Sequence, residues 1–230
     1  MTLILLAGHG AGDPGTVSNN TTEHAEVANI VDKIVRNFKV ETMEPIPLVK
    51  RIALLNKLYD AQDCVVEVHM NSAIFTATGV EVFYEDGLDK DREKAMIMSH
   101  VISRKLGLTD RGAKPDTSTK HKHLGIIRDT ISRSFLIELG FITNKEDLRV
   151  VREKGAEAVL EALREIAEIK PRIPNARVIY EDVVEGDDGW QVIEKMQKKG
   201  IATGPKFYPN LPLTRKDAAR MFERLGLLDR

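Results

Sequence analysis

The stretch that decides the fold reads Leu3-Ile-Leu-Leu-Ala-Gly-His-Gly-Ala-Gly-Asp-Pro-Gly15. Its start, Leu3 to Ala7, is a short continuous apolar run bounded by glycine, which is typical of a strand buried on both faces. Because ligands bind beyond the carboxyl ends of strands in open α/β sheets, His9 falls where a site would lie. A loop histidine that only hydrogen-bonds locally is the alternative, so the interpretation of His9 depends on its partners.

Strand-like and helical patterns alternate along the first 170 residues or so. Further strands are expected at Cys64 to Asn71, Gly79 to Tyr84, Leu124 to Arg128 and Ser134 to Phe141. Helices are expected at Thr22 to Phe38, Leu48 to Tyr59, Asp89 to Leu106, and Asn144 to about Ile169 with a break at Gly155. A polar loop is expected from Thr109 to His123. This alternation predicts an α/β fold with a mainly parallel mixed sheet flanked by helices.

The composition excludes several classes of function. The chain has 230 residues, enough for one good-sized domain with a small appendage. The formal net charge is -1, so nothing favours nucleic acid or a membrane surface as a partner, and the apolar runs are too short to span a bilayer. The single cysteine, Cys64, forbids an internal disulfide. Met1 to Ala7 is too short and lacks the positive charge of a secretory signal, so we expect a protein made in the cytoplasm.

Three residues have the chemistry of a metal site. His9 and His69 each close a predicted strand, and Glu23 opens the helix that follows the first of them. On that helix Glu23 lies at the edge of the apolar stripe, whereas Glu26 is expected to point to solvent. Side chains at the carboxyl ends of adjacent parallel strands, about 4.8 Å apart, can converge on one ion. Two imidazoles and one carboxylate with an open fourth position form a catalytic zinc set.

A fourth residue, Glu138, interrupts the apolar run of the last predicted strand. An ionised carboxylate is not buried without a partner or a function, and its natural function beside zinc is that of a general base. The structural alternative is a buried ion pair with Arg128 or Arg133. Since no local motif such as H-E-x-x-H is present, the residues alone support a metal hydrolase and a metal-free α/β domain about equally.

Several ordered motifs resemble one known family. Gly8-His-Gly-Ala-Gly-Asp-Pro-Gly15, Asn20-Thr-Thr-Glu23, Val68-His-Met-Asn71, and Glu138-Leu-Gly-Phe141 with Asn144 are similar to the zinc-dependent N-acetylmuramoyl-L-alanine amidases of bacterial autolysins and phage endolysins. The resemblance spans about Leu3 to Ile169. It implies Zn²⁺ held by His9, Glu23 and His69, with Glu138 catalytic. The family more often has Asp-Pro before the first histidine, where this chain has Ala7-Gly8. It more often has Ser-Ile-His-x-Asn where this chain has Glu67-Val-His-Met-Asn.

The resemblance implies a peptidoglycan hydrolase that uses zinc-activated water. Such an enzyme cleaves the amide between the lactyl group of N-acetylmuramic acid and L-alanine of the stem peptide. Asn71 is placed to hydrogen-bond the substrate, and Arg128 to meet the stem-peptide carboxylates. A catalytically silent wall-binding protein and a zinc peptidase cutting within the stem peptide are the alternatives. Without an export signal the enzyme would reach the cell wall by release or lysis, as a phage or prophage endolysin does.

The C-terminal part is expected to form a separate unit. We predict a catalytic domain at residues 1–170, a proline-containing linker at 171–177 and a small, mostly helical module at 178–230. Tyr180-Glu-Asp-Val183 and Thr214-Arg-Lys-Asp-Ala218 belong to a pattern that resembles one S-layer homology repeat. This implies binding to a secondary cell-wall polymer, with Trp190, Thr214 and Arg215 as candidate contacts, although Trp190 is first a core anchor. Because such repeats usually pack in threes, a single copy either self-associates between chains or is a degenerate docking module.

Overall fold

The computed structural model describes residues 1–120, 122–169, 178–180, 183–184, 195–196 and 198. The chain divides into two compact units, Met1–Lys170 and Pro171–Arg230. In the described part of the second unit, strand β8 (Val178–Tyr180) pairs antiparallel with β9 (Val183–Val184). The predicted polymer contacts Trp190, Thr214 and Arg215 lie outside the described residues.

The first unit is built on a five-stranded mixed sheet in the order β1-β4-β7-β5-β6. The strands are β1 (Leu3–Ala7), β4 (Cys64–Asn71), β5 (Val80–Tyr84), β6 (Asp110–Pro115) and β7 (Arg133–Phe141). Strands β1, β4 and β7 are parallel neighbours, β5 is antiparallel to β7, and β6 is parallel to β5. The predicted mainly parallel mixed sheet is therefore confirmed.

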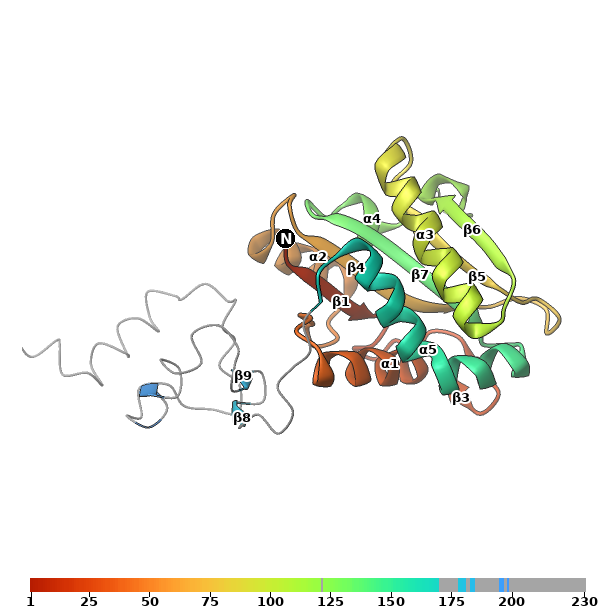
Figure 1. Ribbon diagram of the computed structural model, residues 1–230, viewed down its shortest axis with the longest axis horizontal. Helices are drawn as coiled ribbons and strands as arrows, with labels where there is room; N and C mark the ends of the chain where they lie inside the picture. Colours follow the sequence, from red (N-terminus) through yellow and green to blue (C-terminus); the bar gives the residue numbers. More distant parts are fainter. Residues whose placement is uncertain (121, 170–177, 181–182, 185–194, 197, 199–230) are drawn as a thin grey trace, which may run out of the picture. The chain divides into compact units, whose positions relative to one another are not determined.

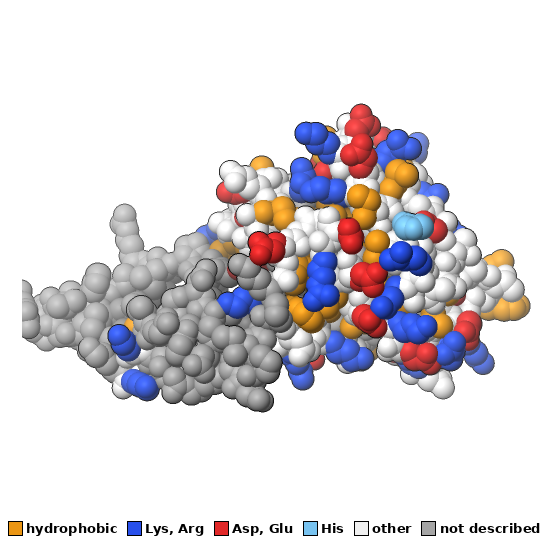
Figure 2. Space-filling view, in the orientation of Figure 1, with side chains coloured by type: hydrophobic (Ala, Val, Ile, Leu, Met, Phe, Trp, Pro, Cys, Tyr) orange, Lys and Arg blue, Asp and Glu red, His pale blue; other side chains and the backbone are white. Residues whose placement is uncertain are grey.

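Helices cover the sheet on both faces (Figure 1). Helices α1 (Glu23–Asn37), α3 (Asp89–Leu106) and α5 (Lys145–Ile166) pack over one face and enclose the larger core. Helices α2 (Leu48–Leu58) and α4 (Gly125–Arg128) pack with a smaller core on the other face. Acidic and basic side chains are interspersed over the face shown in Figure 2, as expected for the solvent side of amphipathic helices. Among the described residues, no helix is long and apolar enough to cross a membrane.

The alternation of side chains along β4 decides where functional groups can lie. Val66 and Val68 point into the larger core. Val65 packs in the smaller core, and Glu67 and His69 follow it at the two-residue period of a strand. The polar residues of β4 thus share the face that α2 and α4 cover.

Helix ends follow local sequence signals. The Thr22 side chain accepts a hydrogen bond from the Ala25 amide, and the Asn144 side chain accepts from two amides of the first turn of α5. Helix α3 stops at Gly107, whose φ of 72° lies in the left-handed region. The cap at Thr22 places Glu23 in the first turn of α1.

Four expectations about local structure were wrong. Leu124 to Arg128 contains the short helix α4, and the predicted polar loop contains the edge strand β6 and the 3-10 helix η1 (Asp116–Ser118). Strand β6 escapes prediction because its sequence, Asp-Arg-Gly-Ala-Lys-Pro, has no apolar alternation.

Gly155 does not break α5; instead it lets Ile30 of α1 pack closely, since a Cβ there would lie 3.0 Å from the Ile30 side chain. A small hairpin of β2 (Val17–Ser18) and β3 (Thr21–Thr22) was not predicted.

The fourth wrong expectation concerns Glu26, which is 8 % exposed rather than directed to solvent. Arg152 of α5 donates to both of its carboxylate oxygens, at 2.7 and 3.0 Å, and the Thr21 hydroxyl donates at 2.6 Å. Helix α5 therefore covers a side of α1 that the apolar periodicity of α1 predicts to face solvent.

Candidate metal centre and active site

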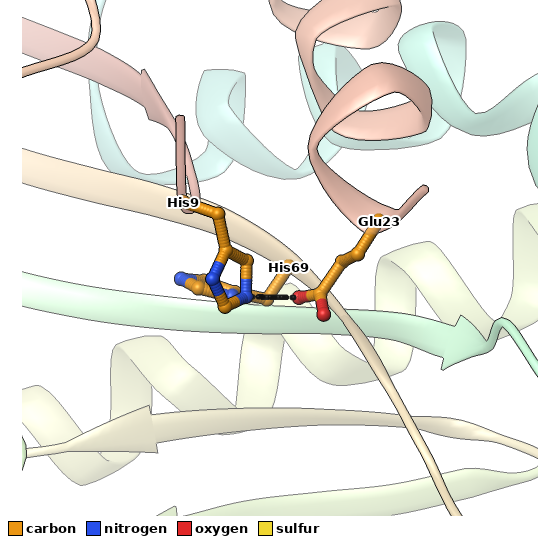
Figure 3. A group of neighbouring side chains, drawn as sticks. All are labelled: His9, Glu23 and His69. Carbon is orange, nitrogen blue, oxygen red and sulfur yellow. Dashed lines mark hydrogen bonds and ion pairs between the residues drawn. The ribbon is translucent and has the colours of Figure 1, made fainter. Parts of the chain in front are cut away.

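Three side chains from separate elements converge at the carboxyl ends of β1 and β4 (Figure 3). Glu23 Oε1 lies 3.0 Å from His9 Nε2 and 2.8 Å from His69 Nδ1. One ligand atom from each of the three residues lies within 4.8 Å of the others, so the set could hold a metal ion. The structure therefore brings together the three residues that the sequence proposes as ligands.

Backbone structure fixes each member of this cluster. His9 lies two residues after the end of β1 and has a φ of 61°, and His69 lies near the end of β4. Glu23 begins α1, and its carboxylate accepts hydrogen bonds from the amides of Thr16 at 3.1 Å and Met70 at 3.2 Å. The glutamate is thus anchored to the glycine loop and to β4 at once.

Two glycines of the opening stretch make room for the cluster. A Cβ on Gly8 would lie 2.4 to 2.6 Å from three atoms of the His69 ring. A Cβ on Gly15 would lie 2.8 Å from both Glu23 Oε2 and His9 Nε2. Since real Cβ atoms do not approach that closely, the absence of side chains at Gly8 and Gly15 allows the ligands to meet.

The carboxylates favour positive charge between the two imidazoles. Burial opposes ionisation of Glu23, but its hydrogen bonds with His69 and His9 hold its pKa well below the ordinary value. The hydrogen bond with Glu23 raises the pKa of His9. Burial works against a charged His69, yet Glu23 and Glu67 raise its pKa. A cluster that stabilises protonated imidazoles is electrostatically suited to a cation.

Glu138 lies one strand away from the cluster. Glu138 of β7 is the register partner of His69 on the parallel strand β4. On its other side, Glu138 pairs in register with Glu81 of the antiparallel strand β5. Its Oε2 is buried and has no hydrogen-bond partner among the described residues. Burial, with help from the Glu23 and Glu81 carboxylates, raises the pKa of Glu138 to about 8. An unpartnered carboxyl group with such a pKa has the properties of a general acid or base.

A cavity of about 530 Å³ opens beside Glu138. Its lining consists of Asn71, Glu81, Phe83, Lys114, Ser118, Thr119, Leu124, Leu136 and Glu138. The Asn71 amide donates to Glu81 Oε1 at 2.8 Å, and Arg111 donates to Glu81 Oε2 at 2.8 Å. The cavity therefore has an acidic group next to the cluster and a cation, Lys114, on strand β6.

The arginines considered for Glu138 are paired elsewhere. Arg128 donates to both carboxylate oxygens of Asp116, at 2.7 and 2.8 Å, and Arg133 pairs with Asp91 at 2.7 Å. The structural alternative of a Glu138 ion pair with either arginine is therefore not observed. Arg128 also does not line the cavity. To contact substrate as predicted, its guanidinium group would have to bind a substrate carboxylate in addition to Asp116.

Sequence reasoning missed two polar groups near the site. Glu81 interrupts the apolar strand Val80–Tyr84 as Glu138 interrupts β7, and the same signal could have found it. Arg51 lies on the buried side of α2, and only the structure shows its partner, Glu67.

Fold and site together define an α/β protein with a candidate metal centre at the carboxyl ends of its parallel strands. The family model of N-acetylmuramoyl-L-alanine amidases matches residues 3–165, and the chain belongs to this family. The S-layer homology domain matches residues 179–219. The protein is thus an amidase that acts on peptidoglycan at the cell wall, with a wall-binding repeat in its C-terminal part.

Several proteins are similar to the first unit of this chain. An uncharacterised protein of Bacillus subtilis, YqiI, is 26% identical over 179 residues, which cover 70% of this chain and 82% of that protein. The probable cell wall amidase LytH of Staphylococcus epidermidis is 26% identical over 168 residues, covering 70% of this chain but only 54% of LytH. The crystal structure of a Neisseria meningitidis protein described as a putative N-acetylmuramoyl-L-alanine amidase shares the fold, with a TM-score of 0.59 and 24% identity over 74% of this chain and 98% of that one.

Proposed function

We propose that this chain cleaves the amide between N-acetylmuramic acid and L-alanine with a zinc ion held by His9, Glu23 and His69. The observation that carries this proposal is the convergence of two imidazoles and a carboxylate beside Glu138, whose buried Oε2 has no hydrogen-bond partner among the described residues. Two nitrogen ligands and one oxygen ligand suit zinc better than magnesium or calcium. Zinc bound there would polarise the scissile carbonyl and lower the pKa of water.

Glu138 moves the proton in this proposal. Its carboxylate accepts a proton from the attacking water and then donates it to the nitrogen of the departing L-alanine, so the group returns to its initial state. Its Oε2, which has no hydrogen-bond partner among the described residues, is free to do both, because no hydrogen bond must break first. Its place on the strand next to His69 puts it beside the cluster without making it a ligand.

Substrate recognition is assigned to the cavity beside Glu138. Asn71 donates to Glu81, and its amide oxygen accepts from the Ser72 amide at 2.8 Å, which leaves the second lone pair of that oxygen for a peptide N–H. Lys114 forms no ion pair among the described residues, and it contributes a cation to a cavity whose other charged side chains are Glu81 and Glu138. We assign Lys114, in addition to Arg128, to a carboxylate of the stem peptide.

The rival functions are separated by the products. Full-length protein with added zinc is incubated with purified peptidoglycan, and the fragments are analysed by mass spectrometry. The proposal predicts free stem peptides that begin with L-alanine, and glycan strands with intact lactyl groups. Cuts within the peptide would instead identify a zinc peptidase, and no cut at all would identify a silent wall-binding protein. With Lys114→Ala, KM for a soluble muropeptide should rise several-fold while zinc content stays unchanged.

The C-terminal part is proposed to bind a secondary cell-wall polymer. The match to an S-layer homology domain supports wall binding, and Trp190, Thr214 and Arg215 are the candidate contacts. Arg215→Ala in the full chain should weaken sedimentation with polymer-bearing walls and leave sedimentation with polymer-stripped walls unchanged. Analytical ultracentrifugation of the parent chain tests self-association through this repeat, which should appear as a species larger than the monomer. A phage or prophage origin remains part of the proposal.

A further inference from the structure

A buried ion pair lies directly behind the metal cluster. Glu67 of β4 and Arg51 of α2 are each 4 % exposed and are joined by a salt bridge through Arg51 Nη1. Removing two charges from water is costly, and an apolar pair of similar volume often stabilises a protein equally well. Both residues come from elements that also supply the smaller apolar core, so two buried charges on this face call for a functional explanation.

The pair touches both candidate histidine ligands. Arg51 Nη2 donates to the backbone carbonyl of His9 at 2.7 Å, and Nη1 lies 3.4 Å from the carbonyl of Ala7. Glu67 Oε2 lies 3.2 Å from Nε2 of His69. One ion pair therefore joins the backbone of one ligand to the ring of the other.

The His69 ring is confined on several sides. Its Nδ1 faces Glu23, and the backbone of Gly8 lies against its flat side. Its Nε2 is buried and has no hydrogen-bond partner among the described residues, because the approach to Glu67 has the distance but not the angle of a hydrogen bond. A small change in ring angle would let Nε2–H donate to Glu67 and leave the Nδ1 lone pair directed at the cluster.

We propose that Glu67, held in place by Arg51, is a positioning residue for the candidate zinc ligand His69. This inference rests on the proposed function. The carboxylate fixes the orientation and tautomer of the imidazole, which is how outer carboxylates act on metal-bound histidines. Arg51 prevents Glu67 from turning away and ties the same unit to the His9 backbone. The Glu67-Val-His69 sequence places the carboxylate on the same face of β4 as the ring it orients.

A purely structural ion pair is the competing explanation, and single substitutions do not separate the two. Replacing only Arg51 or only Glu67 leaves an unpaired charge in the interior, and this charge destabilises the fold whatever the function of the pair. Double variants that remove both charges avoid this problem. R51M/E67L and R51M/E67Q share the same change at Arg51 and differ at Glu67 only in whether an acceptor oxygen faces His69.

The experiment measures two quantities on the full chain. The free energy of unfolding of metal-free protein comes from denaturant titration, and the zinc affinity comes from competition with a chromophoric chelator. We expect R51M/E67L to be about as stable as the parent but to bind zinc about 10- to 100-fold more weakly. R51M/E67Q should recover most of that affinity. Equal zinc affinity of the two double variants would overturn the proposal. If neither folds, Glu67→Gln and Glu67→Leu are compared with each other; both leave Arg51 unpaired, so a difference in their zinc affinity reports only the acceptor oxygen that faces His69, and equal affinity overturns the proposal.

Asp91→Asn is the matched control. It breaks the ion pair between buried Asp91 and the partly exposed Arg133, which begins β7 five residues before Glu138. This variant should lose stability and keep the parent's zinc affinity; a comparable loss of affinity would show that any buried ion pair matters, and would overturn the proposal. A parent protein that binds no zinc would overturn the proposed function as well, whereas zinc binding that ignores Glu67 overturns the positioning role alone.

Discussion

The imidazole rings of His9 and His69 meet edge to face, with their centroids 4.8 Å apart and their planes at 73°. The two residues lie 60 positions apart in the chain, but His9 comes after β1 and His69 lies near the end of β4, its parallel neighbour in the sheet. The pairing of the two strands holds both rings beside Glu23 without help from a flexible segment. The three candidate ligands are therefore preorganised for a metal ion.

The two glutamates at the start of α1 should behave differently. Glu23→Gln removes the carboxylate shared by both imidazoles and should weaken zinc binding by more than about 100-fold. Glu26→Gln breaks the pair with the half-exposed Arg152 and should cost about 1 kcal/mol or less of stability with zinc binding intact. Zinc content by atomic emission and denaturant titration check both. Loss of zinc from the Glu26 variant alone would contradict the ligand assignment.

Glu138→Gln should separate metal binding from turnover. The amide cannot accept the proton of water, so amide hydrolysis should fall by about 100- to 10,000-fold. Because Glu138 is not in the ligand cluster, the variant should keep the zinc content of the parent. Release of stem peptide from a soluble muropeptide measures the first quantity, and emission spectroscopy measures the second. Parental turnover in this variant would rule out Glu138 as the base.

The raised pKa of Glu138 predicts a pH dependence of stability in the metal-free protein. The folded state holds this proton up to a pKa of about 8, whereas the unfolded chain releases it near the ordinary glutamate value. The stabilisation is thus complete below about pH 4.5 and is lost as pH rises towards 8, at up to about 1.4 kcal/mol per pH unit. Denaturant titrations at pH 5 and pH 7 should show the parent losing stability relative to Glu138→Gln. A constant difference between them would refute the shift.

Gly8→Ala should disturb the cluster through packing alone. Gly8 is not among the glycines with positive φ, and the three nearest neighbours of a new Cβ are all atoms of the His69 ring, at 2.4 to 2.6 Å. We expect a loss of about 1–3 kcal/mol in stability, and weaker zinc binding because His69 must move. Gly125→Ala is the control, since its nearest neighbours lie at 3.3 Å or more. Zinc affinity should stay at the parental value in this control.

The thiol of Cys64 should be almost inert in the folded protein. It is 2 % exposed, and burial raises its pKa to about 12. Since the thiolate is the reactive form, labelling by an aromatic disulfide reagent near neutral pH should be at least about a thousandfold slower than in denaturant. As the only cysteine of the chain, it gives one labelling rate to follow. Rapid labelling of the native protein would show that the start of β4 opens.

Local sequence patterns predicted much of the catalytic unit. Apolar runs identified β1, β4 and β7, helical spacing identified the longer helices, and Thr22 and Asn144 identified two helix starts. These signals succeed because strand burial, helix amphipathicity and capping depend on residues close in sequence. The proposed ligands His9, Glu23 and His69 could be chosen for the same reason: each lies next to the end of a recognisable element. Their functional roles stay predictions.

Only the tertiary structure decided which polar groups meet across the sheet and between helices. Arg152 reaches Glu26 from 126 residues away, Arg128 pairs with Asp116, and Arg51 joins Glu67 behind the histidines. No periodicity in one segment encodes these pairs, because each depends on how two separately formed elements pack. By itself the sequence determined the α/β class and the chemistry available at the strand ends. The packing of α2 and α5 against the rest of the unit determined which charges are buried and which side chains they hold.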